Sequence, residues 1–146
     1  MKKKICVITG SRAEYGLLKN LISKFKNDKD IKLKIFVTGM HLSSAFGNTY
    51  KEIIKDGFVV DKKVKILSHS DTPKAVLKST GLGIIKFASL FDANKPDLVV
   101  VLGDRYEIMS ATIAAYFNRI PIAHISGGDT TLGAIDESIR HSITKL

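Results

Sequence analysis

The sequence has one cysteine, no tryptophan and only three prolines among its 146 residues. A single cysteine can form neither a disulfide framework nor a thiolate metal site, and Cys6 stands in an apolar run that is typical of a buried strand. The longest apolar runs, such as Leu98 to Leu102, are far shorter than the roughly 20 residues that cross a membrane as a helix. The first residues, MKKKICVITG, are too few to form a signal peptide. We therefore expect a cytoplasmic protein without a membrane partner.

Acidic residues are also scarce, because 14 Asp and Glu stand against 23 Lys and Arg and leave a net charge of +9. A basic surface can bind nucleic acid. In this sequence, however, the lysines are spread along the expected helix faces and are not interleaved with aromatic residues. We expect a solvated surface and no nucleic-acid partner, with attraction of a small phosphorylated ligand as the remaining interpretation. The lysines concerned are Lys19, Lys24, Lys26, Lys51, Lys55, Lys78 and Lys86.

The apolar pattern alternates between strand and helix along the whole chain, with no repeat or linker. In the first expected helix, Leu17, Leu21 and Phe25 recur at helical spacing. Pro73 suits the first turn of a longer helix that ends near Asn94. Strands are expected at 4–10, 33–39, 63–67 (weak), 97–103 and 120–128, and helices at 13–27, 45–57, 73–94, after 103 to about 118, and 134–146.

This alternation predicts an α/β fold, a Rossmann-like parallel sheet with helices on both faces, formed by residues 1–146 as one domain. Ligands of such sheets bind beyond the carboxyl ends of the strands. Four loops rich in glycine and polar residues fall there. They are TGSRAEYG, TGMHLS, LGDRYE and HISGGD.

The first two loops each allow two interpretations. Ser11 can cap the following helix, or Gly10, Ser11 and Arg12 together can bind an anion at the helix start. His41 can donate to a sugar or phosphate, or it can be a loop histidine without a task.

The other two loops carry more charge. Asp104 follows a buried strand and either caps the next helix or faces the ligand, although a cap alone would not need Arg105 beside it. In a helical DESIRH segment, Asp136 and Arg140 are four residues apart, as are Glu137 and His141, so two ion pairs or a catalytic group are both possible.

These four ordered motifs, ending in PIAHISGGDTTLGAIDESIRHSITKL, resemble the hydrolysing UDP-N-acetylglucosamine 2-epimerases of the sialic-acid pathway over nearly the whole chain. The resemblance implies a GT-B enzyme of two Rossmann-like domains, of which this chain corresponds to the first; the C-terminal nucleotide-binding domain is absent from it. It implies elimination of UDP across C1 and C2 of UDP-N-acetylglucosamine, followed by addition of water to give N-acetylmannosamine.

The resemblance also implies roles for individual residues. It assigns proton transfer to Asp104, Asp136 and Glu137, because carboxylates with tuned pKa values suit removal of a weakly acidic proton. It implies no cofactor, and no metal-ligand cluster appears in the sequence. We expect the full-length protein to be a homo-oligomer. The expected substrate contacts are Arg12, Glu14, His41, Arg105, Asp129, Arg140 and His141.

Two departures from the family pattern leave alternatives open. Ser126 stands where many relatives have an acid or a histidine, and it is a poor general base. Without the second domain the cleft has one wall, so we expect this chain alone to be inactive. The alternatives are an enzyme acting on UDP-diacetylbacillosamine in the legionaminic-acid route, a non-catalytic nucleotide-sugar binding module, and a flavodoxin-like or generic nucleotide-binding domain.

Overall fold

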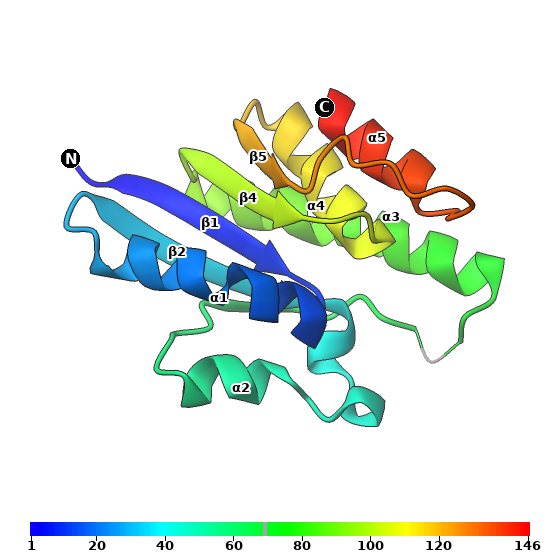
Figure 1. The fold of residues 1–146 in the computed structure, drawn as a ribbon, viewed down its shortest axis with the longest axis horizontal. Helices are drawn as coiled ribbons and strands as arrows, with labels where there is room; N and C mark the ends of the chain where they lie inside the picture. The colour runs from blue at the N-terminus through cyan, green and yellow to red at the C-terminus, as the bar shows by residue number, and fades with distance from the viewer. Residues whose placement is uncertain (69) are drawn as a thin grey trace.

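The computed structural model describes residues 1–68 and 70–146. Its strands form one parallel sheet in the order β3-β2-β1-β4-β5 (Figure 1). The Rossmann-like α/β prediction is therefore confirmed. The strands are β1 (Lys3–Thr9), β2 (Ile31–Thr38), β3 (Lys62–Val64), β4 (Leu98–Leu102) and β5 (Ile122–Ile125).

Helices cover both faces of this sheet (Figure 1). α1 (Arg12–Asn27) and α2 (Tyr50–Lys55) pack on one face, whereas α3 (Pro73–Asn94), α4 (Tyr106–Phe117) and α5 (Glu137–Lys145) pack on the other. Two short 3₁₀ turns, η1 (Gly39–Leu42) and η2 (Ser44–Phe46), lead from β2 toward α2.

The core is divided by the sheet, because successive strand residues point to opposite faces. Cys6 and Ile8 of β1 join the cluster under α3, α4 and α5, while Ile5 and Val7 join the cluster under α1 and α2. Cys6 is buried and unpaired, as its place in the apolar run predicts. Phe87 and Phe91 of α3 stack with ring centroids 5.9 Å apart.

The buried stripe of α1 differs from the predicted one. Leu17 is 72% exposed, and the fully buried side chains are Leu18 and Ile22. Leu21 and Phe25 pack against the same core cluster as predicted, so only Leu17 departs from the predicted stripe. The first turn agrees with the capping interpretation, since Ser11 Oγ accepts a hydrogen bond from the Glu14 N–H at 3.3 Å.

Several other boundaries agree with the sequence pattern, and four differ. α2 spans only Tyr50–Lys55 of the expected 45–57, and β5 spans only Ile122–Ile125 of the expected 120–128. α3 begins at Pro73 and ends at Asn94 as predicted, with Thr72 as its N-cap. The weak strand is shorter and earlier than predicted, at Lys62–Val64. The last helix begins only at Glu137, since turns occupy the preceding residues.

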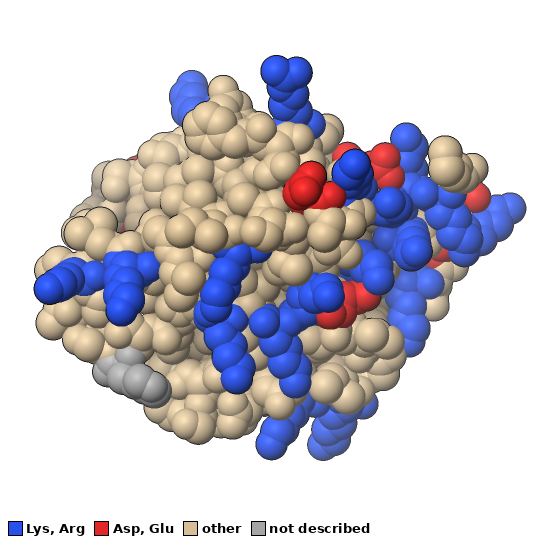
Figure 2. All heavy atoms as spheres, turned by 180° about the vertical axis from the view of Figure 1, so that it is seen from behind, with Lys and Arg blue, Asp and Glu red and all other residues tan. Residues whose placement is uncertain are grey.

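The basic side chains are less evenly placed than the sequence suggests. Figure 2, seen from behind, shows them gathered at the end where the strands begin, while much of the other end carries no charge. β1 begins with Lys3 and Lys4, and β2 contributes Lys32 and Lys34. On the face shown in Figure 2, the positive charge is therefore concentrated at the amino ends of the strands. Over the described ranges, no helix combines the length and apolar character needed to span a bilayer.

Candidate functional site

The strand order reverses direction between β1 and β4, and this places a crevice at their carboxyl ends. The loops that follow β1, β2, β4 and β5 all start at this edge of the sheet (Figure 1). The sequence therefore correctly predicted that these four loops share one edge.

Asp104, at the tip of β4, forms an ion pair with Arg140 of α5. Both side chains are largely buried, with 22% and 14% exposed. The structure does not use Asp104 as a helix cap, because α4 begins at Tyr106 and Arg105 occupies the N-cap position. The Asp104 carboxylate is thus held at the strand tip by a cation that lies 36 residues further along the chain.

Arg140 also forms hydrogen bonds to the loop between β5 and α5. Its Nη1 donates to the backbone oxygen of Asp129 at 3.0 Å and to Thr131 Oγ1 at 2.9 Å. Its Nε is buried without a partner among the described residues. The predicted pair between Arg140 and Asp136 is therefore wrong: Asp136 is exposed, and only its backbone oxygen contacts Arg140. Arg140 reaches across to β4 because its side chain is long enough to leave its own helix face.

The second predicted helix pair is confirmed, since Glu137 Oε1 lies 3.3 Å from His141 Nε2. Asp129 contacts Arg140 only through its backbone oxygen, and the residue lies exposed in the loop between β5 and α5. Ser126 is exposed and adopts a left-handed backbone conformation with φ 58° at the end of β5. Among the acids of this loop and helix, Asp129 and Asp136 are exposed, whereas the Glu137 side chain is 25% exposed, close to the 22% of Asp104.

Glu14 is buried under the first loop, with 6% of its surface exposed. The Gly10 N–H donates to its Oε2 at 2.7 Å, and Ser11 Oγ donates to its Oε1 at 3.2 Å. Burial raises the Glu14 pKa to about 7, against the lowering effect of the Gly10 hydrogen bond, and the charge of Glu107 raises it further. A carboxyl group with this pKa exchanges its proton near neutral pH.

His41 is fully buried and has both ring nitrogens occupied. Nε2 lies 3.0 Å from Thr9 Oγ1, and Nδ1 lies 2.8 Å from Thr49 Oγ1. Burial lowers the His41 pKa to about 4, so the ring is neutral at physiological pH. In this arrangement His41 ties the end of β1 to the turn before α2 and offers no free nitrogen to a substrate.

Arg12 is exposed and pairs with Glu52 of α2, with Nε 3.1 Å from Oε2. An exposed pair of this kind contributes little to stability, typically about 0–1 kcal/mol. Breaking the ion pair with Glu52 therefore costs little free energy, and Arg12 can bind an anionic ligand in its place.

Arg105 lies beside a cavity of about 660 Å³ at the same edge of the sheet. Its Nε and Nη2 donate to the two oxygens of Glu107 at 3.2 and 3.1 Å. Burial lowers the Arg105 pKa, but the charge and hydrogen bonds of Glu107 more than offset this, and the pKa is raised overall.

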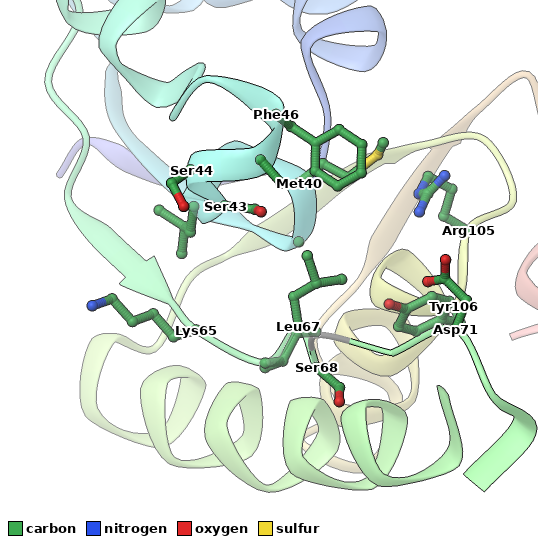
Figure 3. A pocket seen from close by; sticks show the side chains of 14 residues that line it. Met40, Ser43, Ser44, Phe46, Lys65, Leu67, Ser68, Asp71, Arg105 and Tyr106 are labelled. Atoms are coloured by element: carbon green, nitrogen blue, oxygen red, sulfur yellow. The ribbon is translucent and has the colours of Figure 1, made fainter. Parts of the chain in front are cut away.

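The cavity has polar groups on several sides, and its volume is in the range of small-molecule sites. Figure 3 shows Lys65 and Arg105 on opposite sides of it, with the Tyr106 hydroxyl and Asp71 near Arg105. Ser43 and the following turn η2, with Ser44 and Phe46, contribute to the wall. The Lys65 ammonium points away from the other labelled side chains, so Arg105 is the cation placed to bind an anionic ligand in the cavity.

Sequence reasoning missed two functional positions. Glu107 is fully buried and accepts hydrogen bonds from Arg105. The sequence indicates this contact only by placing an acid two residues after Arg105 in GDRYE. His124 of β5 connects the loop after β4 to helix α5, with Nε2 2.7 Å from the Gly103 oxygen and Nδ1 3.0 Å from Thr144 Oγ1. Nothing in the spacing of His124 indicates this contact.

Groups of three or more His, Cys, Asp or Glu that could hold a metal ion do not occur in residues 1–68 and 70–146. The described residues at this edge of the sheet include carboxyl groups and arginine side chains; carboxyl groups can transfer protons and arginines can bind anions.

Comparison with known proteins gives one consistent result. The family model described as UDP-N-acetylglucosamine 2-epimerase matches residues 23–146. The chain is 49% identical over 99% of its length to the GDP/UDP-N,N'-diacetylbacillosamine 2-epimerase (hydrolyzing) of Campylobacter jejuni, and 45% identical over 99% to polysialic acid biosynthesis protein P7 of Escherichia coli. It spans 38% and 37% of the length of these two relatives.

Solved structures agree on the fold. The Neisseria meningitidis UDP-GlcNAc 2-epimerase bound to UDP-GlcNAc matches 97% of this chain with a TM-score of 0.82 and 22% identity, and the chain covers 37% of it. The Rickettsia bellii UDP-N-acetylglucosamine 2-epimerase matches 99% with a TM-score of 0.77 and 26% identity, with 36% of it covered. From the family match and these relatives, the chain belongs to the UDP-N-acetylglucosamine 2-epimerase family.

Proposed function

We propose that residues 1–146 form the N-terminal domain of a longer, two-domain hydrolysing UDP-sugar 2-epimerase. The observation that carries this proposal is the half-buried Asp104 carboxylate, held at the tip of a central strand by Arg140 and placed at the ligand edge of the sheet. The 49% identity to a hydrolysing 2-epimerase supports it.

The proposed reaction has two steps. A carboxylate removes the proton on C2 of the sugar while the bond from C1 to the diphosphate oxygen breaks, and UDP leaves with its electron pair. This gives an unsaturated 1,2-glycal. Water then adds its hydroxyl group to C1 and a proton returns to C2 from the opposite face, which releases the 2-epimeric free sugar.

Asp104 is proposed to transfer the proton, because Arg140 fixes its carboxylate and leaves the carboxylate's other oxygen without a partner among the described residues. Asp136 and Glu137 are proposed to share acid and base tasks from the start of α5. Arg12 and Arg105 are proposed to meet the charge that develops on the departing diphosphate, and Glu14, Asp129 and His141 stay predicted substrate contacts. His41 is better assigned to holding the first loop.

The preferred substrate is UDP-N-acetylglucosamine, which gives N-acetylmannosamine for sialic-acid or surface-polysaccharide synthesis. The Escherichia coli relative is named polysialic acid biosynthesis protein P7, which supports this route. UDP-diacetylbacillosamine is the second candidate, because the Campylobacter jejuni relative and a 38% identical Legionella pneumophila relative are named 2-epimerases of diacetylbacillosamine. Both substrates are UDP-linked 2-acetamido sugars, so the proposed chemistry is the same.

We further propose a cytoplasmic enzyme that needs no cofactor and binds neither nucleic acid nor membrane. The lysines are not interleaved with aromatic residues in the sequence, which supports the exclusion of single-stranded nucleic acid. Homo-oligomerisation of the full-length protein stays a prediction.

The test compares both substrates on the full-length enzyme. Each UDP-sugar is incubated with the enzyme, and UDP release and the free sugar are quantified to give kcat/KM. We expect one of the two to be converted to UDP and its 2-epimeric free sugar with the higher kcat/KM. Binding of both sugars without any UDP release would instead support the non-catalytic binding module and overturn the proposal.

A further inference from the structure

Glu107 is an acidic side chain whose surface is 0% exposed, in the first turn of α4. Removing a carboxylate from water costs several kcal/mol unless a cation and hydrogen bonds compensate it. Among the described residues, its partner is Arg105, which donates from Nε and Nη2 to the two carboxylate oxygens. This two-point contact fixes the plane of the guanidinium as well as its position.

The backbone leaves room for this carboxylate at Gly39. Gly39 has φ +55°, and a Cβ there would lie 2.7 Å from Glu107 Oε1 and 3.1 Å from the Gly10 oxygen. Any larger residue would therefore collide with Glu107 and strain the left-handed backbone. The chain thus accommodates a buried negative charge at the switch point of the sheet, between the loops that follow β1 and β2.

The two members of the pair are buried to different extents. The Glu107 side chain is 0% exposed, whereas Arg105 is 37% exposed and lines the cavity. A guanidinium has five N–H groups, and the contact with Glu107 uses two of them. The remaining N–H groups have no partner within residues 1–68 and 70–146 and can donate toward the cavity, where Figure 3 shows the Arg105 guanidinium.

We infer that Glu107 is a positioning residue that holds the Arg105 guanidinium toward the cavity so that it binds the diphosphate of the UDP-sugar. This inference deepens the proposed function and depends on it for the identity of the ligand. Glu107 does not touch the ligand: it orients Arg105 and limits its rotamers before binding, so less conformational entropy is lost on binding.

The test is a double-mutant cycle on the full-length enzyme, read by calorimetric titration with UDP. Glu107→Gln keeps the size of the side chain but removes its charge. Because a hydrogen bond to a charged group contributes about 1.5–3 kcal/mol, Arg105→Ala is expected to raise the UDP Kd by roughly 10- to 100-fold. Glu107→Gln is expected to raise it by a smaller factor of roughly 5- to 10-fold, and the double variant is expected to bind no more weakly than Arg105→Ala alone.

A control and a second readout separate positioning from simple support of the fold. Asp92→Asn removes an exposed charge in the last turn of α3, which leads into the start of β4, whereas the cavity lies at the carboxyl ends of the strands. This variant is expected to leave the UDP Kd unchanged. In steady-state kinetics, Glu107→Gln is expected to lower kcat as well as raise KM, because Arg105 also meets the charge that develops on the departing diphosphate. If Glu107→Gln does not fold, Glu107→Asp keeps the charge, withdraws the carboxylate by one methylene, and is expected to show the same lack of additivity with Arg105→Ala.

The outcomes distinguish the two proposals. Unchanged UDP binding in a folded Glu107 variant, additive losses in the cycle, or no UDP binding by the wild-type enzyme would overturn the positioning role. A non-additive cycle in an enzyme that binds UDP but releases none from either UDP-sugar would support the positioning role and overturn the proposed 2-epimerase activity.

Discussion

At the scale of single residues, Glu14 and His41 are two buried titratable groups with opposite shifts. Burial raises the pKa of Glu14 from its ordinary value of 4.5 to about 7 and lowers that of His41 from 6.5 to about 4. Both groups are therefore neutral over part of the physiological range, and each retains its hydrogen bonds in that form.

The raised Glu14 pKa gives a definite pH dependence of stability. Between pH 4.5 and 7 the folded state binds more protons at Glu14 than the unfolded state does, so its contribution to the unfolding free energy falls as pH rises. The shift corresponds to about 3 kcal/mol. We expect Glu14→Gln, which mimics the protonated acid, to gain about this much stability relative to wild type between pH 5 and pH 8.

Chemical denaturation at several pH values measures the difference between the two proteins. His41 acts with the opposite sign, because its folded pKa is lowered and its contribution is lost as pH falls from 6.5 toward 4. Since both proteins contain His41, this effect cancels in the difference. A difference that stays constant with pH would show that Glu14 titrates at its ordinary pKa in the folded chain.

Asp104 is the residue whose substitution separates catalysis from structure. Asp104→Asn keeps the shape and can still accept a hydrogen bond from Arg140, but an amide cannot take the C2 proton. In the full-length enzyme we expect kcat to fall by roughly 10²- to 10⁴-fold, while the fold survives with a loss of stability no larger than the about 1–3 kcal/mol expected for breaking this pair. Wild-type turnover in a folded Asp104→Asn enzyme would remove Asp104 from the proton transfer.

At the scale of elements, Arg140 is the connection between α5, β4 and the loop of residues 126–136. It binds Asp104, the Asp129 oxygen and Thr131. Arg140→Gln is expected to destabilise the chain by about 1–3 kcal/mol, because it leaves the half-buried Asp104 charge without its cation. Hydrogen exchange should then increase in the loop before α5 and stay unchanged in β1.

A matched substitution in another ion pair provides the comparison for Arg140. Lys19 pairs with Asp56 at 2.8 Å on the α1 side of the sheet, and its side chain is 48% exposed. Lys19→Gln is expected to change stability by less than about 1 kcal/mol. Equal effects of the two substitutions would mean that burial of the Asp104 pair does not matter.

The elements also show what the sequence could and could not predict. The bounds of α3 were predictable because Thr72 and Pro73 mark its start chemically and Pro96 follows its end. The loops at the ligand edge were predictable from strand polarity alone. The partner of Arg140 was not, because helical spacing offered Asp136 nearby while Asp104 approaches only through the packing of α5 beside β4. Glu107 was missed because an acid in a first helical turn ordinarily stays in solvent.

At the scale of the whole molecule, this chain spans 38% and 37% of the length of its Campylobacter jejuni and Escherichia coli relatives. The cavity is bounded by η1, η2 and the loops after β3 and β4, and Asp104 lies at the neighbouring strand tip. Positioning of a reactant accounts for about 7–11 kcal/mol of many enzymatic rate accelerations. We therefore expect the 146-residue chain alone to release no measurable UDP from UDP-N-acetylglucosamine, as judged by chromatography against the full-length enzyme.

Incorporation of deuterium from solvent tests the elimination and addition chemistry most directly. The full-length enzyme is supplied with UDP-N-acetylglucosamine in D₂O, and the free sugar is analysed by nuclear magnetic resonance and mass spectrometry. We expect N-acetylmannosamine with one deuterium at C2, together with free UDP, because the C2 proton is removed and replaced from solvent. Release of N-acetylglucosamine that keeps its original C2 proton would show simple hydrolysis of the sugar phosphate bond and would contradict a 2-epimerase.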